Sequence, residues 1–431
     1  MSAFQEEIIE KVESLEEYLL STTQELVRIP SINHPPTGEE YECQMVVAQH
    51  LRQMGLEPDI YYLDDVPELK EHPSFWSGRD YSNRPNVSAR RKGSGGGLSI
   101  VLSGHIDTVP LGTKDWNCDP FEGKIEDGKL YGLGTYDMKS GDAINLGVMR
   151  TLQELNIPLL GDVIFETVVD EEFGGVNGTI AGRLRGDNGD GVIITEPSDL
   201  MICNGNRGGQ VAHITLEGPE GIVFEDEAEE PGHAIRELAH FLKWVDKFRQ
   251  RRRDSLPSWE PGPFDPIPVW VTKVSSGGWG TNVPITVPPD VKVELFLQLM
   301  PGEEKDQVRG ELLDLLDEMV ADKPNDFKRR PKVEFPIRFM PGSEIPVDSS
   351  IIKSLNRCAQ DVIGYPLDVR PIPAPSDLYT VQLDFNTPAV HFGVRGGGAH
   401  AADEFVIIED LVTVTKVLAL FTLDWCGVAA Q

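Results

Sequence analysis

The chain has 431 residues, with 70 Asp and Glu against 39 Lys and Arg, so its formal net charge at pH 7 is -31. This acidic balance argues against nucleic acid and anionic membrane surfaces as partners. It favours cations, metal ions included, although high solubility or a salty habitat would explain the same composition. Hydrophobic cores stop growing near roughly 250 to 300 residues, so we expect two domains.

The first twenty residues, MSAFQEEIIEKVESLEEYLL, place apolar residues at helical spacing among glutamates, which predicts a helix. No apolar run here or later approaches the ~20 residues that a bilayer span needs. The five cysteines lie far apart without a C-x-x-C spacing, which is typical of a reducing compartment. We therefore expect a cytoplasmic protein without an export signal.

Three apolar runs that each end in polar residues predict buried strands. They are LSIVLSGHID (98–107), DVIFETVVDEE (162–172) and GVIITEPSDL (191–200). The helical pattern DAINLGVMRTLQEL (142–155) lies between the first two, and such alternation predicts an α/β domain, a mostly parallel twisted sheet with helices on both faces. Because ligands bind at the carboxyl ends of such strands, the three polar ends are expected to meet in one crevice.

The pattern changes at about residue 208. GGQVAHITLEG alternates as a strand, and PGHAIRELAHFLKWVDKFRQRRR is a helix with a basic last turn. Two strand-like runs, PIPVWVTKV and DVKVELFLQLM, precede the helical EEKDQVRGELLDLLDEMVAD, and KVEFPIRF follows. This order predicts a small inserted α+β domain. The expected division is residues 1–207 with 330–431 as the first domain, and 208–329 as the insert.

Seven ionisable residues occur at the predicted strand ends or in short polar motifs. They are His105 and Asp107 in SGHIDTVP, Asp137 in GTYDMKSG, Glu171 and Glu172 in VVDEEFGG, Glu196 in ITEPS and His400 in GGGAHAADEF. Each alone has an ordinary explanation, because carboxylates often cap helices and a single histidine is usually an ordinary polar residue. Together, two imidazoles and several carboxylates form the donor set that two zinc, cobalt or manganese ions sharing one carboxylate require.

These motifs give the sequence a close resemblance to the dinuclear zinc amidohydrolases, the family of acetylornithine deacetylase, succinyl-diaminopimelate desuccinylase, aminoacylases and carboxypeptidase G. The matching segments are SGHIDTVP, DPFEGKIEDGKLYGLGTYDMKSG, TVVDEEFGGVNGT, IITEPS and AHAADEF, in the family's order and spacing. The resemblance implies a zinc exopeptidase-like catalytic domain with an inserted lid domain. In this family the lid closes over the site and often mediates dimerisation, so a homodimer is an expectation.

The resemblance also implies a role for each of the seven residues. His105, Asp137 and Glu196 would hold one metal ion, and Asp137, Glu172 and His400 the other, with Asp137 bridging. Glu171 would be the general base. The Asp107 carboxylate would orient the His105 ring and fix its tautomer. Two zinc ions are the first expectation, with cobalt or manganese as alternatives, and family members commonly have a cis peptide bond after the bridging Asp.

Two further motifs imply contacts to the substrate. RGG (207–209) and GTNVP (280–284) stand where the family has a substrate-contacting Arg and Asn, which makes Arg207 and Asn282 candidates. The lid histidine that polarises the scissile carbonyl is replaced by Ile222. His233, after an acidic run, is a candidate for the missing donor, although a position at a helix start fits a structural role equally well. The lid arginine that usually grips a substrate carboxylate is replaced by Gln298.

The leading interpretation is a metal-dependent hydrolase of a linear amide, acting on a small N-acylated amine or amino acid in the manner of acetylornithine deacetylase. A carboxypeptidase or dipeptidase of the same family is the alternative, and Gln298 argues mildly against a strict requirement for a free carboxylate. From another class, a non-catalytic binding protein that retains the fold would explain the replaced lid histidine.

Overall fold

The structure is a computed structural model that describes residues 3–172, 174–218, 221–222, 233–255, 269–278, 286–323, 327 and 329–429. The chain forms two compact units. Unit 1 comprises Met1–Gly205, Glu344–Ile372 and Ser376–Gln431, and unit 2 comprises Asn206–Ser343 and Pro373–Pro375. The second boundary therefore lies beyond the expected residue 330. Strand β16 (Lys332–Glu334) pairs with β11 (Gly208–Glu217), which places it in the sheet of unit 2.

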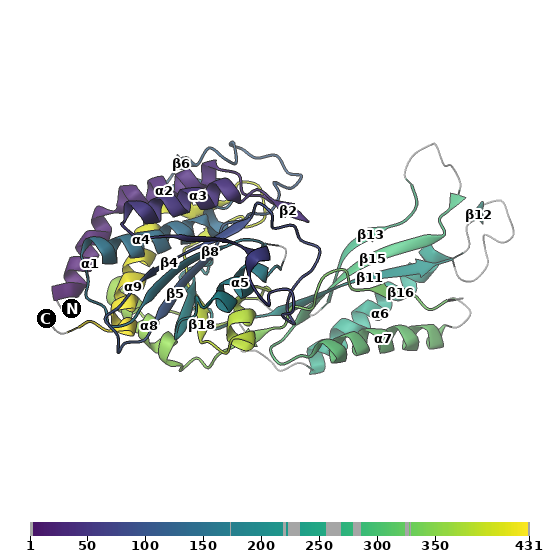
Figure 1. The fold of residues 1–431 in the computed structure, drawn as a ribbon. Helices are drawn as coiled ribbons and strands as arrows, with labels where there is room; N and C mark the ends of the chain where they lie inside the picture. Colours follow the sequence, from purple (N-terminus) through teal and green to yellow (C-terminus); the bar gives the residue numbers. More distant parts are fainter. Residues whose placement is uncertain are drawn as a thin grey trace. The chain divides into compact units, whose positions relative to one another are not determined.

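Unit 1 is built on a six-stranded mixed sheet (Figure 1). Its strands, in spatial order, are β18 (Ala389–His391), β9 (Gly191–Ile194), β5 (Ile100–His105), β8 (Val163–Val168), β4 (Pro85–Arg91) and β3 (Asp59–Tyr62). The first four run parallel, and β4 and β3 are antiparallel to their neighbours. The predicted α/β class is confirmed, and the three predicted site strands β9, β5 and β8 are neighbours at the centre.

Every residue of β5, β8 and β9 is buried, so both faces of the sheet are covered. On one face, Leu102 and Phe165 belong to the large core that includes residues of helices α4 (Ser140–Glu154) and α9 (Ile408–Cys426). On the other face, Val101 and Ile164 pack with Leu378 and residues near it. This burial on both faces explains why the strands are continuous apolar runs in the sequence.

The remaining elements of unit 1 surround this sheet. Its other helices are α1 (Ala3–Ser14), α2 (Glu16–Arg28), α3 (Tyr41–Gln53), α5 (Asn177–Arg185) and α8 (Ser350–Ile363). A small second sheet has the order β19 (Gly396–Gly397), β20 (Phe405–Ile407), β7 (Lys129–Tyr131) and β6 (Lys124–Glu126). Short pieces complete the unit, among them the hairpin β1 (Asn33–His34) and β2 (Thr37–Gly38), and η1 (Leu63–Asp65), η2 (Thr135–Lys139) and η4 (Thr380–Asp384).

Unit 2 contains an antiparallel sheet in the order β13 (Val269–Ser275), β15 (Asp290–Leu299), β11 and β16. Helices α6 (Ala234–Ser255) and α7 (Lys305–Asp322) pack against it around a separate core, in which Leu295 of β15, Phe241 of α6 and Leu312 of α7 are fully buried. β12 (Gly221–Ile222) pairs with β14 (Thr286–Val287). The predicted order of strands and helices in the insert is confirmed.

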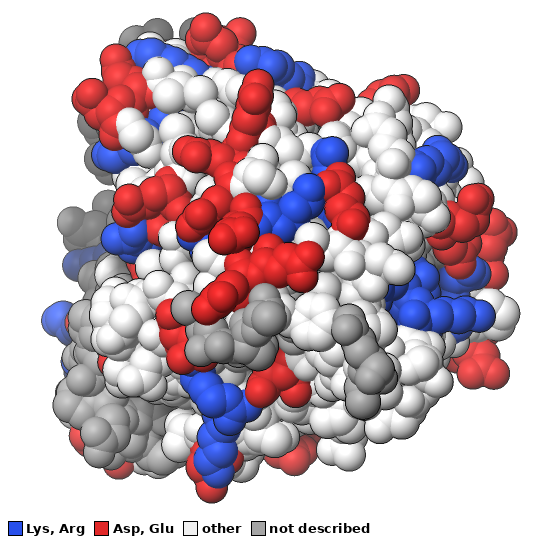
Figure 2. Space-filling view, turned by 90° about the vertical axis from the view of Figure 1, so that its left-hand side faces the viewer, with Lys and Arg blue, Asp and Glu red and all other residues white. Residues whose placement is uncertain are grey.

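The surface of unit 1 reflects the acidic composition. Figure 2 shows the end that carries both termini, where acidic side chains form a broad red area across the middle of the face. Six glutamates of α1 and α2 are exposed, at positions 6, 7, 10, 13, 16 and 17. None of the helices in the described part of the chain combines the length and the apolar character that a membrane span requires.

Candidate metal centre

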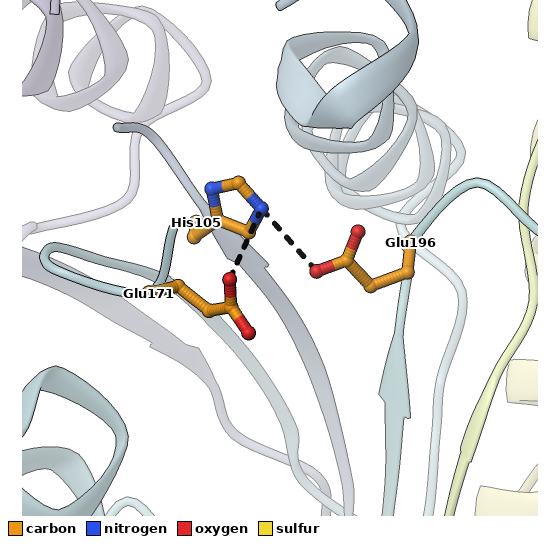
Figure 3. A group of neighbouring side chains, drawn as sticks. All are labelled: His105, Glu171 and Glu196. Atoms are coloured by element: carbon orange, nitrogen blue, oxygen red, sulfur yellow. Dashed lines mark ion pairs between the residues drawn. The ribbon is translucent and has the colours of Figure 1, made fainter. Parts of the chain in front are cut away.

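Three central strands of unit 1 bring the first group of site residues together. In the sheet register, His105 at the end of β5 lies opposite Val168 at the end of β8, and Ser103 lies opposite Ile194 at the end of β9. The segments that follow β8 and β9 carry Glu171 and Glu196, so both carboxylates reach the imidazole of His105 (Figure 3). The predicted convergence at one edge of the sheet is confirmed.

His105 is 2% exposed, and its Nε2 atom faces three carboxylates. Nε2 lies 3.2 Å from Asp137 Oδ1, 3.3 Å from Glu196 Oε1 and 4.0 Å from Glu171 Oε2. The other ring nitrogen, Nδ1, is 3.0 Å from the main-chain oxygen of Asp107. A proton on Nδ1 donated to that oxygen leaves the Nε2 lone pair free for a cation.

The Asp107 carboxylate therefore differs from its expected role. Its Oδ1 is 3.7 Å from His105 Nδ1, beyond hydrogen-bonding distance, because the main-chain oxygen of Asp107 lies closer to the ring. The carboxylate instead accepts the main-chain N–H of Glu171 at 3.2 Å and of Glu172 at 3.1 Å. Asp107 orients His105 through its backbone and holds the Glu171–Glu172 turn through its side chain.

Asp137 occupies the middle of the site. Gly134, three residues before Asp137, has φ +79°. The peptide bond from Asp137 to Met138 is cis, which confirms the expected cis bond after this residue. One carboxylate oxygen, Oδ1, faces His105 at 3.2 Å, and the other, Oδ2, faces His400 Nε2 at 3.3 Å. The two oxygens thus point to two different imidazoles, as a carboxylate shared by two cations must.

His400 and Glu172 form the second group. His400 lies between β19 and β20 with φ +60°, and its Nε2 is 2.8 Å from Glu172 Oε2. The Glu172 side chain is 2% exposed, whereas that of His400 is 53% exposed. The second oxygen of Glu172, Oε1, accepts the main-chain N–H of Val109 at 3.2 Å. One side of the site is therefore buried and the other opens at His400.

The protonation of these groups reflects crowded, buried carboxylates. Burial, together with the negative charge of Asp137, raises the pKa of Glu196 to about 8 and that of Glu172 to about 7, against the opposing effect of the nearby histidines. Hydrogen bonds to Asp137 and Glu172 raise the pKa of His400 to about 11. Burial opposes ionisation of Asp137, but hydrogen bonds from the two histidines hold its pKa below the ordinary value. Such a set of carboxylates needs cations, and the imidazole and carboxylate donors fit divalent metal ions.

Glu171 differs from its neighbour Glu172. Burial raises its pKa well above the ordinary value, although the positive charge of His105 opposes this. Its Oε1 accepts the main-chain N–H of Asp377 at 3.3 Å, and its Oε2 stays 4.0 Å from His105. A raised pKa brings a carboxylate toward the range in which it both accepts and returns protons near neutral pH.

Three residues that sequence reasoning missed support the site from outside. Asn33 Nδ2 donates to Asp107 Oδ2 at 2.8 Å. The buried side chain of Asp377 accepts from Thr179 Oγ1 at 2.6 Å, which fixes the residue whose N–H meets Glu171. Glu404 accepts three main-chain N–H groups of the segment that carries Asp137. Of these, only Glu404 lay within a motif used for the resemblance, AHAADEF.

The candidates for substrate contacts belong to unit 2. Arg207 is 4% exposed, and its Nη1 donates to Gln298 Oε1 at 3.3 Å. Gln298 Nε2 donates in turn to the main-chain oxygen of Pro373 at 2.7 Å, so both ends of this amide are engaged within the unit. The main-chain oxygen of His233 accepts the N–H of Glu237 at the start of α6, which fits the structural role, and burial lowers the pKa of its ring. Asn282, the side chain of Ile222 and the acidic run at 225–230 lie outside the described residues.

Comparisons with known proteins agree with this arrangement. The sequence matches Peptidase family M20/M25/M40 over residues 101–424. It is 26% identical to N-formyl-4-amino-5-aminomethyl-2-methylpyrimidine deformylase from Halalkalibacterium halodurans, over 98% of this chain and 97% of that protein. The fold is similar to that of human carnosine dipeptidase 1, with a TM-score of 0.73, 16% identity and 99% of each chain covered. It is also similar to a dinuclear metal-binding peptidase of the M20 family from Bacillus subtilis, with a TM-score of 0.61, 17% identity, and 97% of this chain and 100% of that chain covered.

Proposed function

Because the chain belongs to peptidase family M20/M25/M40 and is a metal-dependent hydrolase of amides, we propose that it removes the acyl group from a small N-acylated amine at the Asp137 site. The observation that carries this proposal is the position of Asp137 between His105 and His400, one carboxylate oxygen toward each ring. A carboxylate between two imidazoles is better explained by the binding of two cations and a water molecule than by a purely structural role.

The family binds two metal ions, and the proposed ligands divide into two sets that share Asp137. His105, Asp137 and Glu196 hold one ion, and Asp137, Glu172 and His400 hold the other. Zinc is the proposed metal, and cobalt and manganese suit the same nitrogen and oxygen donors. When bound, the two ions supply an acidified water and stabilise negative charge on the carbonyl oxygen of the substrate.

Glu171 is the proposed general base. Its carboxylate takes the proton of the attacking water and then delivers it to the nitrogen of the departing amine. Asp377 holds one oxygen of Glu171 through its N–H, and Asp107 holds the Glu171 N–H. Both contacts fix the direction in which this carboxylate faces the imidazole of His105.

The proposed substrate is an amide whose amine part needs no carboxylate. Gln298 supports this proposal, because its amide is engaged by Arg207 and Pro373 and brings no charged donor to an anionic group. The substrate in the name of the relative from Halalkalibacterium halodurans is an N-formylated aminomethylpyrimidine, whose amine part has no carboxylate. Arg207, Asn282 and His233 are the proposed contacts to the remainder of the substrate.

A cytoplasmic homodimer is the proposed state of the enzyme. All five cysteines are free, which fits a reducing compartment. Strand β13 ends the described sheet of unit 2 and exposes Trp270 and Val274, and the neighbouring helix α6 exposes Ile235 and Leu242. An edge strand beside apolar side chains offers a surface for pairing with a second copy. Light scattering of the wild type and of Val274→Lys tests this, and a wild-type monomer contradicts it.

The activity test is the release of a primary amine from a panel of N-formyl and N-acetyl amines, N-acyl amino acids and dipeptides. The protein is loaded with zinc or cobalt, and a chelated sample is the control. The proposal expects turnover that depends on metal and is fastest for acylated amines without a carboxylate. Fastest turnover of dipeptides would instead place the chain among the peptidases of its family, and binding without turnover would make it a non-catalytic member.

A further inference from the structure

Asp170, the residue before the two glutamates of the site, has an unusual position. It is fully buried, and it has φ +68°, in the left-handed region that a non-glycine residue seldom adopts. Such a residue persists only when its surroundings fix it, and it marks the point where the chain leaves β8 and turns into Glu171. The direction of the Glu171 side chain therefore depends on how Asp170 is held.

Four side chains donate to the Asp170 carboxylate or lie against it, among them Arg79, whose Nε is 3.6 Å from Oδ2. Tyr81 Oη donates to Oδ2 at 2.5 Å, and Asn33 Nδ2 donates to Oδ1 at 3.0 Å. Arg84 Nη2 lies 3.5 Å from Oδ1, and the same guanidinium forms hydrogen bonds with the buried carboxylate of Glu40. The Tyr81 hydroxyl also accepts a hydrogen bond from Asn177 at 2.8 Å, so its own position is fixed.

Asn33 connects Asp170 with the other support of the turn. Its Nδ2 atom donates to Asp170 Oδ1 at 3.0 Å and to Asp107 Oδ2 at 2.8 Å. The Asp107 carboxylate accepts the main-chain N–H groups of Glu171 and Glu172. The Glu171–Glu172 turn is thus held by the carboxylate of Asp170, which precedes it, and by that of Asp107, which accepts its N–H groups. The side-chain amide of Asn33 connects these two carboxylates.

We infer that Asp170 is a positioning residue for the general base, and that Tyr81 and Asn33 act through it to set where the Glu171 carboxylate points. The inference rests on the proposed function, in which Glu171 moves the proton. Glu172, one residue further along, has independent contacts with His400 and with the N–H of Val109. Disturbing Asp170 should therefore disturb proton transfer by Glu171 more than metal binding by Glu172.

The sharpest test removes one atom. Tyr81→Phe deletes the hydroxyl that donates to Asp170 and leaves the buried ring in place. The matched control is Tyr18→Phe on α2, which deletes the hydroxyl 3.1 Å from His50 Nδ1 in the same unit, away from the Glu171 turn. For both variants and the wild type, kcat and KM are measured on the amide that the wild type turns over fastest, together with bound metal and the midpoint of thermal unfolding.

We expect Tyr81→Phe to lower kcat about tenfold or more, because small displacements of a catalytic group have large effects on rate. Its KM should stay within about twofold of the wild type and its metal content should be unchanged, since the affected step is proton transfer. Tyr18→Phe should keep the kcat of the wild type. Equal kcat values for the two variants, or a loss of activity in Tyr81→Phe that follows a loss of metal, would overturn the inference.

Two further variants keep the test decisive. Asn33→Ala removes the donor to the other carboxylate oxygen of Asp170 and should give the same fall in kcat at constant KM. This variant replaces Tyr81→Phe in the test if Tyr81→Phe does not fold. Glu171→Gln separates this inference from the proposed function. If Glu171→Gln is inactive while Tyr81→Phe and Asn33→Ala are as active as the wild type, only the role of Asp170 is wrong. If Glu171→Gln is fully active, the proposed base itself is wrong.

Discussion

Glu404 lies four residues after His400 in the chain, and its carboxylate accepts the main-chain N–H of Asp137 at 3.0 Å. The same carboxylate accepts the N–H groups of Tyr136 at 2.8 Å and Gly134 at 3.0 Å. A side chain from the same segment as His400, a proposed ligand, therefore holds the backbone of Asp137, the proposed bridging residue. The segments that carry Asp137 and His400, two ligands of the proposed second metal ion, are therefore connected by hydrogen bonds even without a cation.

Glu404→Gln should weaken metal binding. Glutamine replaces one acceptor oxygen by a donor group that faces N–H donors, so the segment of Asp137 loses part of its support. We expect the affinity for the metal to fall about 10- to 100-fold, as for other groups that orient metal ligands. Competition with a chromophoric chelator measures this affinity. Glu409→Gln is the control, since Glu409 is exposed and pairs only with Arg395 among the described contacts, and an equal loss there would contradict the role of Glu404.

Substitution of the two adjacent glutamates should give opposite results. Glu171→Gln should keep two metal ions and lose on the order of 10² to 10⁴ in kcat, because an amide cannot accept the proton of water. Glu172→Gln should lose metal, because Glu172 faces His400 at 2.8 Å. Metal analysis together with steady-state kinetics distinguishes the two roles. Metal loss in Glu171→Gln with metal retention in Glu172→Gln would reverse the assignment.

Metal binding should release protons at neutral pH. The pKa of Glu196 is raised to about 8 and that of His400 to about 11 in the metal-free protein, so both hold protons at pH 7. A cation binds the deprotonated forms, so its apparent affinity should rise as the pH increases from 6 to 8. Titration calorimetry in buffers of different ionisation enthalpy measures the number of protons released. A binding enthalpy independent of the buffer would show that these groups are already deprotonated.

His391 should destabilise the fold in acid. Burial lowers the pKa of this histidine to about 3, so it stays neutral in the folded protein while its unfolded form gains a proton below its ordinary pKa. Its stabilising contribution is therefore complete above about pH 6.5 and decreases as the pH falls toward 3, by about 1.4 kcal/mol per pH unit. Chemical denaturation at pH 5, 6 and 7 measures the slope, and His391→Gln should have the smaller one. Parallel slopes for both proteins would disprove this contribution.

Removal of the carboxylate from the substrate should lower kcat/KM only a little. The measurement compares kcat/KM for an N-acyl basic amino acid with kcat/KM for its C-terminal amide, which differs only in this group. The engaged amide of Gln298 leads us to expect a ratio well below 10³, which corresponds to about 4 kcal/mol of transition-state binding. A larger loss on the amide would show that the carboxylate is gripped and return the chain to the amino acid deacylases or carboxypeptidases.

The strands of the site were predictable from sequence because each is an apolar run that ends in ionisable residues. Burial on both faces makes β5, β8 and β9 continuous in hydrophobicity, and their parallel pairing brings His105, Glu171 and Glu196 to the same edge. Asp137 and His400 lie outside these strands, so their inclusion in the site depended on their donor chemistry and on the resemblance to a family rather than on their position in the sheet.

The supports of the site were not predictable in the same way. Asn33, Asp377 and Glu404 act on main-chain or side-chain groups that lie far from them in sequence, so no local pattern marks their partners. The His-x-Asp spacing of His105 and Asp107 indicated a contact, but whether the side chain or the main-chain oxygen approaches the ring depends on the turn after β5. The expected domain boundary at residue 330 falls before β16, although the strand-like run that contains β16 was predicted, because only the pairing of β16 with β11 shows to which sheet this strand belongs.

The insertion of unit 2 into the chain has a consequence for the order of events during synthesis. Strand β9 ends at Ile194, and its partner β18 begins at Ala389, so the central sheet waits for the ribosome to pass through the whole insert. At about 5 to 20 residues per second, this delay is roughly 10 to 40 seconds. The proposed first metal set, His105, Asp137 and Glu196, exists on the nascent chain throughout this time, whereas the second set lacks His400. The proposed pair of ions therefore requires a chain that has been synthesised at least as far as His400 and Glu404, the support of Asp137.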